Sequence, residues 1–228
     1  MFSGFPEAGF IFLQSLLENN NREWFEAHKD EYIKYLKTPA TEFIQALGEK
    51  LKTISPAIQY DVRGSLMRIH RDTRFSKDKT PYKIEVTTMF WQGDGKKTEL
   101  PCFGFRIHAL EGAGLLGGVY QFTKPMLEAY RIAVLDDKQG AALIRAAEAV
   151  PSEYSLNGQT FKRVPRGYDA EHPRAEWLKY SGLFAISPHI PLATVKTAEL
   201  VDACFEHCRK MSPIQQWLAL NLLPELSQ

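Results

Sequence analysis

The sequence predicts an α+β fold, with a central antiparallel sheet packed on one face by N-terminal and C-terminal helices. Three observations indicate this fold. Apolar residues recur at helical spacing in the first third of the chain, alternating runs joined by short loops fill the middle, and helical patterns return in the last third. Because we find no internal repeat and no linker, we expect residues 1–228 to form a single domain.

Apolar stripes predict three helices in the first third. The first covers 10–17 and ends at three consecutive asparagines. Asn20 is expected to cap the second helix, with Glu23 as its reciprocal partner three residues later. Thr38 and Pro39 are residue types that begin a helix, so we expect them to start the third.

The middle of the chain predicts strands. Residues 66–71, 84–91 and 101–110 alternate between the two sides of a strand, and 84–91 is rich in β-branched and aromatic residues. A glycine-containing turn at 111–114 is followed by an apolar return over 115–122, which is typical of a hairpin. Strands joined by such short loops form antiparallel sheets.

The last third mixes helices with short strands. Asn157-Gly158 between strand-like runs predicts a type I′ hairpin turn. Ser212-Pro213 is expected to start a new, final helix. The other elements expected here are helices at 123–135, 138–150, 172–180 and 200–211, and a strand at 183–186.

The composition excludes several classes of protein. The formal net charge of +1 argues against a protein that coats nucleic acid through bulk electrostatics, but does not exclude a local nucleic-acid site. Three cysteines are an odd number and no disulfide framework, which favours a reducing, cytoplasmic setting. Residues 1–12 lack a basic n-region, and no window has the roughly 18 apolar residues that a membrane span needs. We therefore expect no signal peptide and no membrane association.

The most informative segment, 68–83, concentrates positive charge. It carries six cations against two acids, an excess of four, in a chain whose net charge is only +1. A local excess of this kind indicates a site for an anion, because the charge is balanced elsewhere in the chain. The cations are Arg68, Arg71, Arg74, Lys77, Lys79 and Lys83, and the acids are Asp72 and Asp78.

Strand alternation gives this segment an expected geometry. Arg68 and His70 should point to one side of their strand, and Arg106 and His108 should share a side of a later strand. If both strands belong to one sheet, its face without helices presents two guanidinium groups and two imidazoles. Guanidinium groups bind phosphate or carboxylate through two parallel hydrogen bonds, and the loop 74–83 can fold over such a site as a wall.

These residues lead to the hypothesis of a protein that binds an anionic, phosphate-bearing small molecule. Whether it is also an enzyme stays open. If it is, His70 or His108 would transfer the proton, because imidazole titrates near neutral pH. The expected ligand-binding residues are Arg68, His70, Arg71, Arg74, Lys77, Lys79, Lys83, Arg106 and His108.

Three alternatives stay open at this point, and the sequence does not indicate the oligomeric state. The cations can pair with neighbouring acids, Asp72 and Asp78 among them, and form an ordinary solvated surface. The same loop can bind nucleic acid, in which case exposed aromatic side chains should lie beside it. It can also dock an acidic protein partner, for which an exposed apolar patch next to the loop would be evidence.

Three motifs carry a family resemblance. Residues 19–25 read NNNREWF, residues 71–83 read RDTRFSKDKTPYK, and residues 165–169 read PRGYD shortly before His172-Pro173. In this combination the chain resembles a bacterial conserved-hypothetical family of unknown function, over nearly its whole length. The resemblance implies one intact family unit, which agrees with a single domain, and it assigns no catalytic residue.

Other clusters of chemically active side chains have simpler explanations. Cys204, His207 and Cys208 are zinc-ligand types on one predicted helix, but no fourth ligand accompanies them, and cysteines on an apolar stripe are usually core residues. Glu171 and His172 fit the entry of a helix. We therefore expect neither a metal site nor a cofactor.

Overall fold

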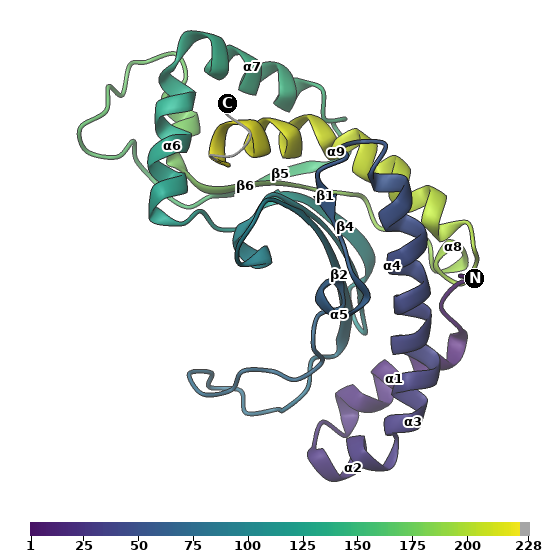
Figure 1. Ribbon diagram of the computed structural model, residues 1–228. Helices are drawn as coiled ribbons and strands as arrows, with labels where there is room; N and C mark the ends of the chain where they lie inside the picture. The colour runs from purple at the N-terminus through teal and green to yellow at the C-terminus, as the bar shows by residue number, and fades with distance from the viewer. Residues whose placement is uncertain (224–228) are drawn as a thin grey trace.

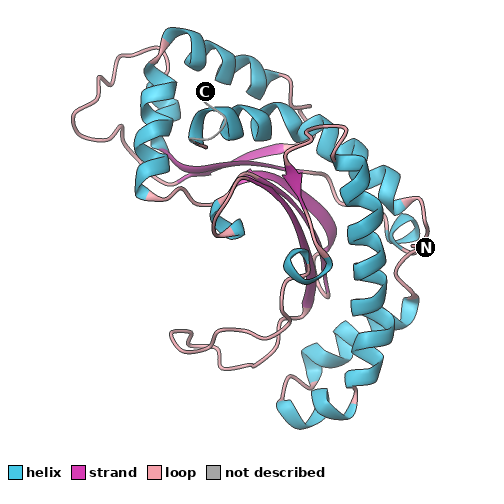
Figure 2. Cartoon of the chain, viewed as in Figure 1, coloured by secondary structure: helices cyan, strands magenta, loops and turns pink. Residues whose placement is uncertain are grey.

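The structure, a computed structural model, describes residues 1–223 and confirms the α+β fold. Figure 1 shows helices packed along the outer side of a strongly curved sheet. Figure 2 gives the same view coloured by secondary structure, and the inner side of the curve carries little helix. The sheet therefore has one covered, convex face and one largely open, concave face.

The sheet of the described residues has six strands, all paired antiparallel, in the order β1-β2-β3-β4-β6-β5. Its centre is a meander that is continuous in sequence, because β2, β3 and β4 follow one another along the chain. The last strand, β6, returns to pair with β4. The strands are β1 Ile58–Gln59, β2 Glu85–Gln92, β3 Cys102–His108, β4 Gly112–Val119, β5 Ser155–Gln159 and β6 Tyr180–Ile186.

The helices precede, interrupt and follow this sheet, and α4 and α9 cover its convex face. The helices before the meander are α1 Glu7–Glu18, α2 Arg22–Ala27, α3 Lys29–Tyr32, the π-helix η1 Ile33–Lys37, α4 Thr38–Leu51 and α5 Val62–Ser65. The later ones are the 3-10 helix η2 Lys97–Glu99, α6 Lys124–Leu135, α7 Asp137–Glu148, the 3-10 helix η3 Ala175–Lys179, α8 Leu192–Val195 and α9 Leu200–Leu222.

Side-chain alternation decides which face each residue of the meander occupies. In β3, Phe103, Phe105 and Ile107 are buried in the core. The ring of Phe105 lies 4.8 Å from the ring of Phe43 of α4, centroid to centroid, which places these side chains on the convex face. Arg106 therefore points the other way, onto the concave face, since successive strand residues alternate.

The hydrophobic core is continuous from one end of the described chain to the other. Phe2 and Leu222 both belong to the same cluster of buried side chains. Single-domain organisation stays a prediction, although this cluster agrees with it. Among the helices of residues 1–223, none combines the length and the apolar character that crossing a bilayer requires.

The second helix begins one residue later than the sequence predicted. Asn21, not Asn20, is the N-cap of α2, and its side chain accepts a hydrogen bond from the N–H of Trp24 at 2.9 Å. Asn20 instead bonds to the backbone of Tyr82, which is 62 residues away. The prediction chose the wrong member of a run of identical residues because each can cap a helix.

Of two predicted helix starts, one is confirmed in position and the other is wrong. Helix α4 begins at Thr38, with Pro39 in its first turn. Thr38 is no cap, because it follows the π-helix η1 without a break and has helical φ and ψ angles of −64° and −52°. Pro213 lies inside α9 rather than at the start of a new helix. Proline removes one backbone hydrogen bond from such a helix. The packing of α9 over the sheet outweighs that cost, since Ile214 and Trp217 beyond the proline are buried.

The predicted strand at 66–71 is only an extended segment with two isolated bridges. Leu66 pairs with Thr88, and His70 pairs with Tyr82. These two pairs differ in register by two residues, and the chain bends at Ile69 between them. The segment is therefore no continuous strand, although Ile69 is buried between the exposed Arg68 and His70, as alternation predicts.

Two further local predictions were wrong. Asn157 and Gly158 lie within β5 rather than in a hairpin turn, and Gly158, with φ of +110°, lies at the register shift in its pairing with β6. The helix expected from His172 is only the short η3, and β6 begins directly after it at Tyr180. Glycine supplies the positive φ that a bulge needs, as it would in a turn, so the sequence signal was ambiguous.

Candidate functional site

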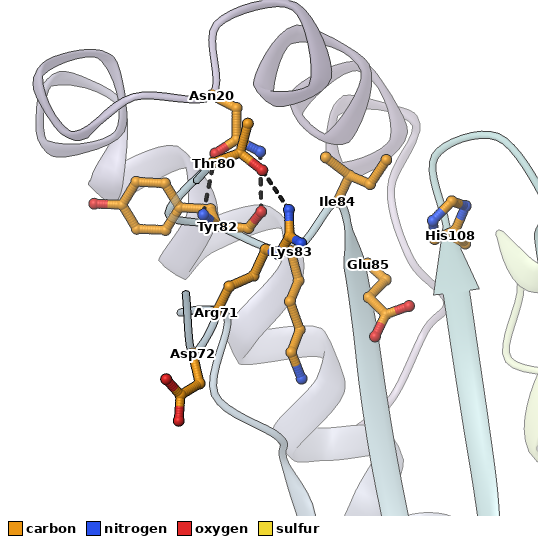
Figure 3. Close-up of a pocket in the computed structure, with 9 residues that line it drawn as sticks. All are labelled: Asn20, Arg71, Asp72, Thr80, Tyr82, Lys83, Ile84, Glu85 and His108. Atoms are coloured by element: carbon orange, nitrogen blue, oxygen red, sulfur yellow. Dashed lines mark hydrogen bonds between the residues drawn. The ribbon is translucent and has the colours of Figure 1, made fainter. Parts of the chain in front are cut away.

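A pocket of about 400 Å³ lies where the basic segment meets the end of the meander. It is lined from three parts of the chain: the start of α2, the segment 71–85 and the end of β3. Figure 3 shows the side chains of Lys83 and Glu85 extending toward one side, with the imidazole of His108 beside Glu85. The lining residues are Asn20, Arg71, Asp72, Thr80, Tyr82, Lys83, Ile84, Glu85 and His108.

Asn20 and Tyr82 hold the N-terminal helices against this pocket. The side-chain nitrogen of Asn20 donates to the carbonyl of Tyr82 at 2.9 Å, and the N–H of Tyr82 donates back to the Asn20 oxygen at 3.0 Å. The ring of Tyr82 also stacks on Phe25 of α2, with centroids 4.1 Å apart. Asn20 therefore positions the backbone from which Lys83 extends.

Lys83 is the uncommitted cation of the pocket. Within residues 1–223, its ammonium group makes no hydrogen bond and no ion pair. Its backbone is fixed, because the N–H of Lys83 donates to the carbonyl of Ile69 at 2.8 Å. A fixed backbone with a free ammonium group leaves three donors for an incoming acceptor.

Both acids of the pocket already have arginine partners. Arg74 bonds to both carboxylate oxygens of Asp72, at 3.0 and 2.7 Å, and lowers the pKa of that carboxyl. Arg106 forms an ion pair with Glu85 at 3.5 Å. These pairs reduce the repulsion that Asp72 and Glu85 would otherwise exert on an anion near Lys83.

His108 contributes a hydrogen-bond donor of defined position. Its Nδ1 accepts from the backbone N–H groups of Leu110 and Glu111, both at 3.2 Å. An accepting Nδ1 places the proton of the neutral ring on Nε2. The second ring nitrogen is therefore free to donate to a ligand without any change of tautomer.

An ion pair between Arg71 and Asp78 joins the two ends of the loop that follows Arg71. Arg71 donates to Asp78 and to the hydroxyl of Thr80, and this contact with Arg71 is the main reason why the pKa of Asp78 falls to about 2. For Arg71 and Arg74, the alternative of an ordinary solvated surface therefore applies. Asp78 balances the charge of Arg71, and Asp72 balances the charge of Arg74. Lys79 donates to the carbonyl of Thr73 at 2.9 Å.

Arg68 and His70 do not join Arg106 and His108 in the way alternation predicted. His70 packs beside the ring of Tyr82, with centroids 5.1 Å apart, and 6.2 Å from Phe25. Those two rings belong to the core under the helices. Arg68 is exposed and does not line the pocket. His70 is exposed as well and does not line the pocket either.

Arg106 lies on the concave face as predicted but is already committed. It bonds to Glu111 in the β3–β4 turn and pairs with Glu85 of β2. Lys77 is exposed in the loop and has no ion pair among the residues the structure describes. Of the nine predicted residues, the pocket brings together Arg71, Lys83 and His108.

The three cysteines are buried core residues. Cys102, Cys204 and Cys208 are unpaired and buried, and burial raises the pKa of each thiol, that of Cys102 to about 12. The Nδ1 atom of His207 shares a hydrogen bond with the hydroxyl of Tyr154. No group of three or more His, Cys, Asp or Glu residues within 1–223 has a metal-binding arrangement.

A family model matches most of the chain. The family model described as a conserved hypothetical protein (DUF2461) matches residues 8–217. The matched range contains all nine predicted ligand-binding residues. No curated protein matches the chain.

Proposed function

Because the chain belongs to the conserved hypothetical protein family DUF2461, we propose its function from the pocket itself: it binds an anionic small molecule with a phosphate-like group at Lys83 and His108. The observation that carries this proposal is the unpaired ammonium group of Lys83 in a pocket whose acids already have arginine partners. Arg71 borders the same pocket, with its charge balanced by Asp78.

The ammonium group and the imidazole suit a tetrahedral oxyanion. Lys83 supplies a point charge with three donors, and the Nε2–H of His108 supplies a directed donor. Asn20 and the backbone bonds of Lys83 hold the site before any ligand arrives, which reduces the ordering cost of binding. Three further predicted cations without an ion pair among the described residues, Arg68, Lys77 and Lys79, would act by raising the local potential.

Inorganic phosphate is the probe that tests this proposal. We expect Lys83→Met to weaken phosphate binding at least about tenfold, since one hydrogen bond to a charged group is worth roughly 1.5–3 kcal/mol. Isothermal titration calorimetry at pH 7 would measure the change. Lys138→Met, on the exposed side of α7, is the matched control and should bind phosphate like the wild type. Equal affinity of the Lys83 variant and the wild type would rule the proposal out.

A second candidate function, nucleic-acid binding by the loop, is favoured by Phe75. This side chain is 94% exposed between Arg74 and Lys77, and Arg74 lies 5.8 Å from its ring centroid. An exposed aromatic ring among cations is a stacking platform for a base.

The second candidate predicts salt-sensitive binding to a single-stranded oligonucleotide that depends on Phe75. Because stacking of one base contributes about 1–3 kcal/mol, Phe75→Ala should weaken binding of an oligothymidylate about tenfold in fluorescence anisotropy. Leu110→Ala removes another exposed apolar side chain, at the β3–β4 turn, and should have no effect. Binding that is insensitive to added salt would count against nucleic acid.

A further inference from the structure

A groove of about 550 Å³ lies on the concave face of the sheet, beside the proposed site. Its volume is within the range of small-molecule sites. The groove adjoins the pocket that contains Lys83 and His108, called the anion pocket from here on. Glu85 lines the anion pocket, Arg106 lines the groove, and these two residues form an ion pair at 3.5 Å. The two cavities therefore share one boundary.

The walls of the groove are mainly apolar and partly aromatic. Met89 of β2 and Leu116 of β4 border its middle, and Ile186 of β6 is 39% exposed there. At one end the rings of Tyr120 and Phe184 lie 5.3 Å apart, and Tyr120 is 67% exposed. Exposed apolar surface in a concavity indicates a ligand that removes it from water.

The floor of the groove is bare backbone at its centre. Gly104 pairs with Met89 and Leu116 in neighbouring strands, and Gly114 pairs with Arg106. Neither glycine has a positive φ, and a Cβ atom would lie 3.7 Å from the nearest atom at Gly104 and 3.8 Å at Gly114. Neither backbone conformation nor packing inside the protein therefore requires glycine there, and their absent side chains account for the depth of the groove.

A flat ring fits this combination of a bare floor and apolar walls. Peptide planes that are not covered by side chains allow a planar group to lie against them at van der Waals distance. The aromatic pair at one end offers an edge or a face to such a ring. A branched aliphatic chain would use the apolar walls but not the flat floor.

The spacing along the strands links the ring to the anion. Gly114 lies opposite Arg106, which precedes His108 by two residues in β3. Gly104 precedes Arg106 by two more residues in the same strand. At about 3.3 Å per residue, these positions are roughly 7 and 13 Å from the anion pocket along the strand. A short linker between an anionic group and a ring spans this separation.

We propose that the concave groove binds the flat aromatic ring of the same ligand whose anionic group binds at Lys83. This proposal rests on the proposed function and extends it: the ligand class is an aromatic or heteroaromatic compound that carries a phosphate-like group on a short linker. Lys83 and His108 hold the anion, and Gly104, Gly114 and the apolar walls hold the ring.

Adenosine 5′-monophosphate, inorganic phosphate and adenosine are three probes that separate the two halves of the site. We expect the monophosphate to bind at least about tenfold more tightly than inorganic phosphate in calorimetry, because the ring removes apolar surface from water. Gly104→Val and Gly114→Val fill the groove and should reduce monophosphate affinity to that of phosphate, while phosphate affinity stays unchanged. Gly104→Ala adds only one methyl group and should have a smaller effect.

The outcomes distinguish the two proposals. If phosphate binds but the monophosphate binds no more tightly, or if both valine variants bind the monophosphate like the wild type, the ring site is wrong and the anion site stands. In another outcome, adenosine binds but phosphate does not, and the valine variants abolish the binding of adenosine. The anion site is then wrong, and the proposal that the groove binds a ring stands. A valine variant that does not unfold cooperatively would not be a folded protein and could not test the groove. Met89→Ala, in the groove wall, then takes its place. If Met89→Ala binds the monophosphate with the same affinity as the wild type, the ring site is wrong.

Discussion

Gly118→Ala is expected to lower the free energy of unfolding by more than about 4 kcal/mol, or to prevent folding altogether. Gly118 has a φ of +139°, which an L side chain rarely adopts, and this strain alone costs about 1–3 kcal/mol. A Cβ atom there would also lie 2.3 Å from the carbonyl oxygen of Leu183 and 2.7 Å from the Cα of Phe184. Because both are backbone atoms of the paired strand β6, relief requires the β4–β6 pairing to open. Urea denaturation followed by circular dichroism would measure the loss.

Gly104→Ala is the matched control for that substitution. It adds the same methyl group in the neighbouring strand β3, at a residue without positive φ and with 3.7 Å to the nearest atom. We expect stability within about 1 kcal/mol of the wild type, and a small gain is reasonable because alanine restricts the unfolded chain. Equal destabilisation by the two substitutions would show that the β4–β6 contact is not what requires glycine at position 118.

Asn20→Ala is expected to lower the free energy of unfolding by about 1–3 kcal/mol, the cost of leaving buried polar groups without partners. The substitution removes both hydrogen bonds to Tyr82 and leaves its backbone N–H and carbonyl without these partners. Because the backbone of Lys83 follows directly, we also expect weaker phosphate binding. Urea denaturation and calorimetry on the same variant would test the two effects together.

The neighbouring Asn19 provides the control for Asn20. Its side chain bonds only to the carbonyl of Ser15, one turn away, and it is exposed. Asn19→Ala should therefore change stability by no more than about 0.5 kcal/mol. Asn20→Asp keeps an acceptor for the N–H of Tyr82 but cannot donate to its carbonyl, so we expect an intermediate loss. If the variants at positions 19 and 20 behave alike, Asn20 is not a tether.

The sheet was predictable because its signals are local and repeated. In β3, Phe103, Phe105 and Ile107 alternate with Arg106 over a whole strand, so the sequence predicted both the strand and the open face of Arg106. The short β3–β4 turn predicted the antiparallel partner. Such patterns involve many residues, and one exception does not change the interpretation.

The helix ends and the segment 66–71 were not predictable from local sequence, because distant contacts decide them. Asn20 and Asn21 are identical residues, and only the position of Tyr82 in space determines which one caps α2. Pro213 normally starts a helix, but burial of α9 against the sheet keeps one helix continuous through it. Likewise the bend at Ile69 follows from its irregular pairing with 82–88, for which the alternation of 66–71 gives no signal.

The sequence predicted only part of the candidate site, because local patterns indicate some of its residues and distant contacts place the others. Arg71 and Lys83 belong to the charged segment 68–83, and His108 ends the predicted strand β3. All three line the pocket. His70 is exposed, but it lies beside Tyr82 and does not line the pocket. The role of Asn20 was missed, although the motif at 19–25 contains one asparagine more than a helix cap needs.

The burial of the three cysteines makes the molecule convenient for site-specific labelling. Thiolates react with maleimide dyes, and burial both raises the thiol pKa values and blocks access to Cys102, Cys204 and Cys208. A thiol introduced by Lys77→Cys, on the exposed loop, would be the only accessible one in residues 1–223. A fluorophore attached there would report changes in the surroundings of the loop when an anion binds, in an otherwise native chain.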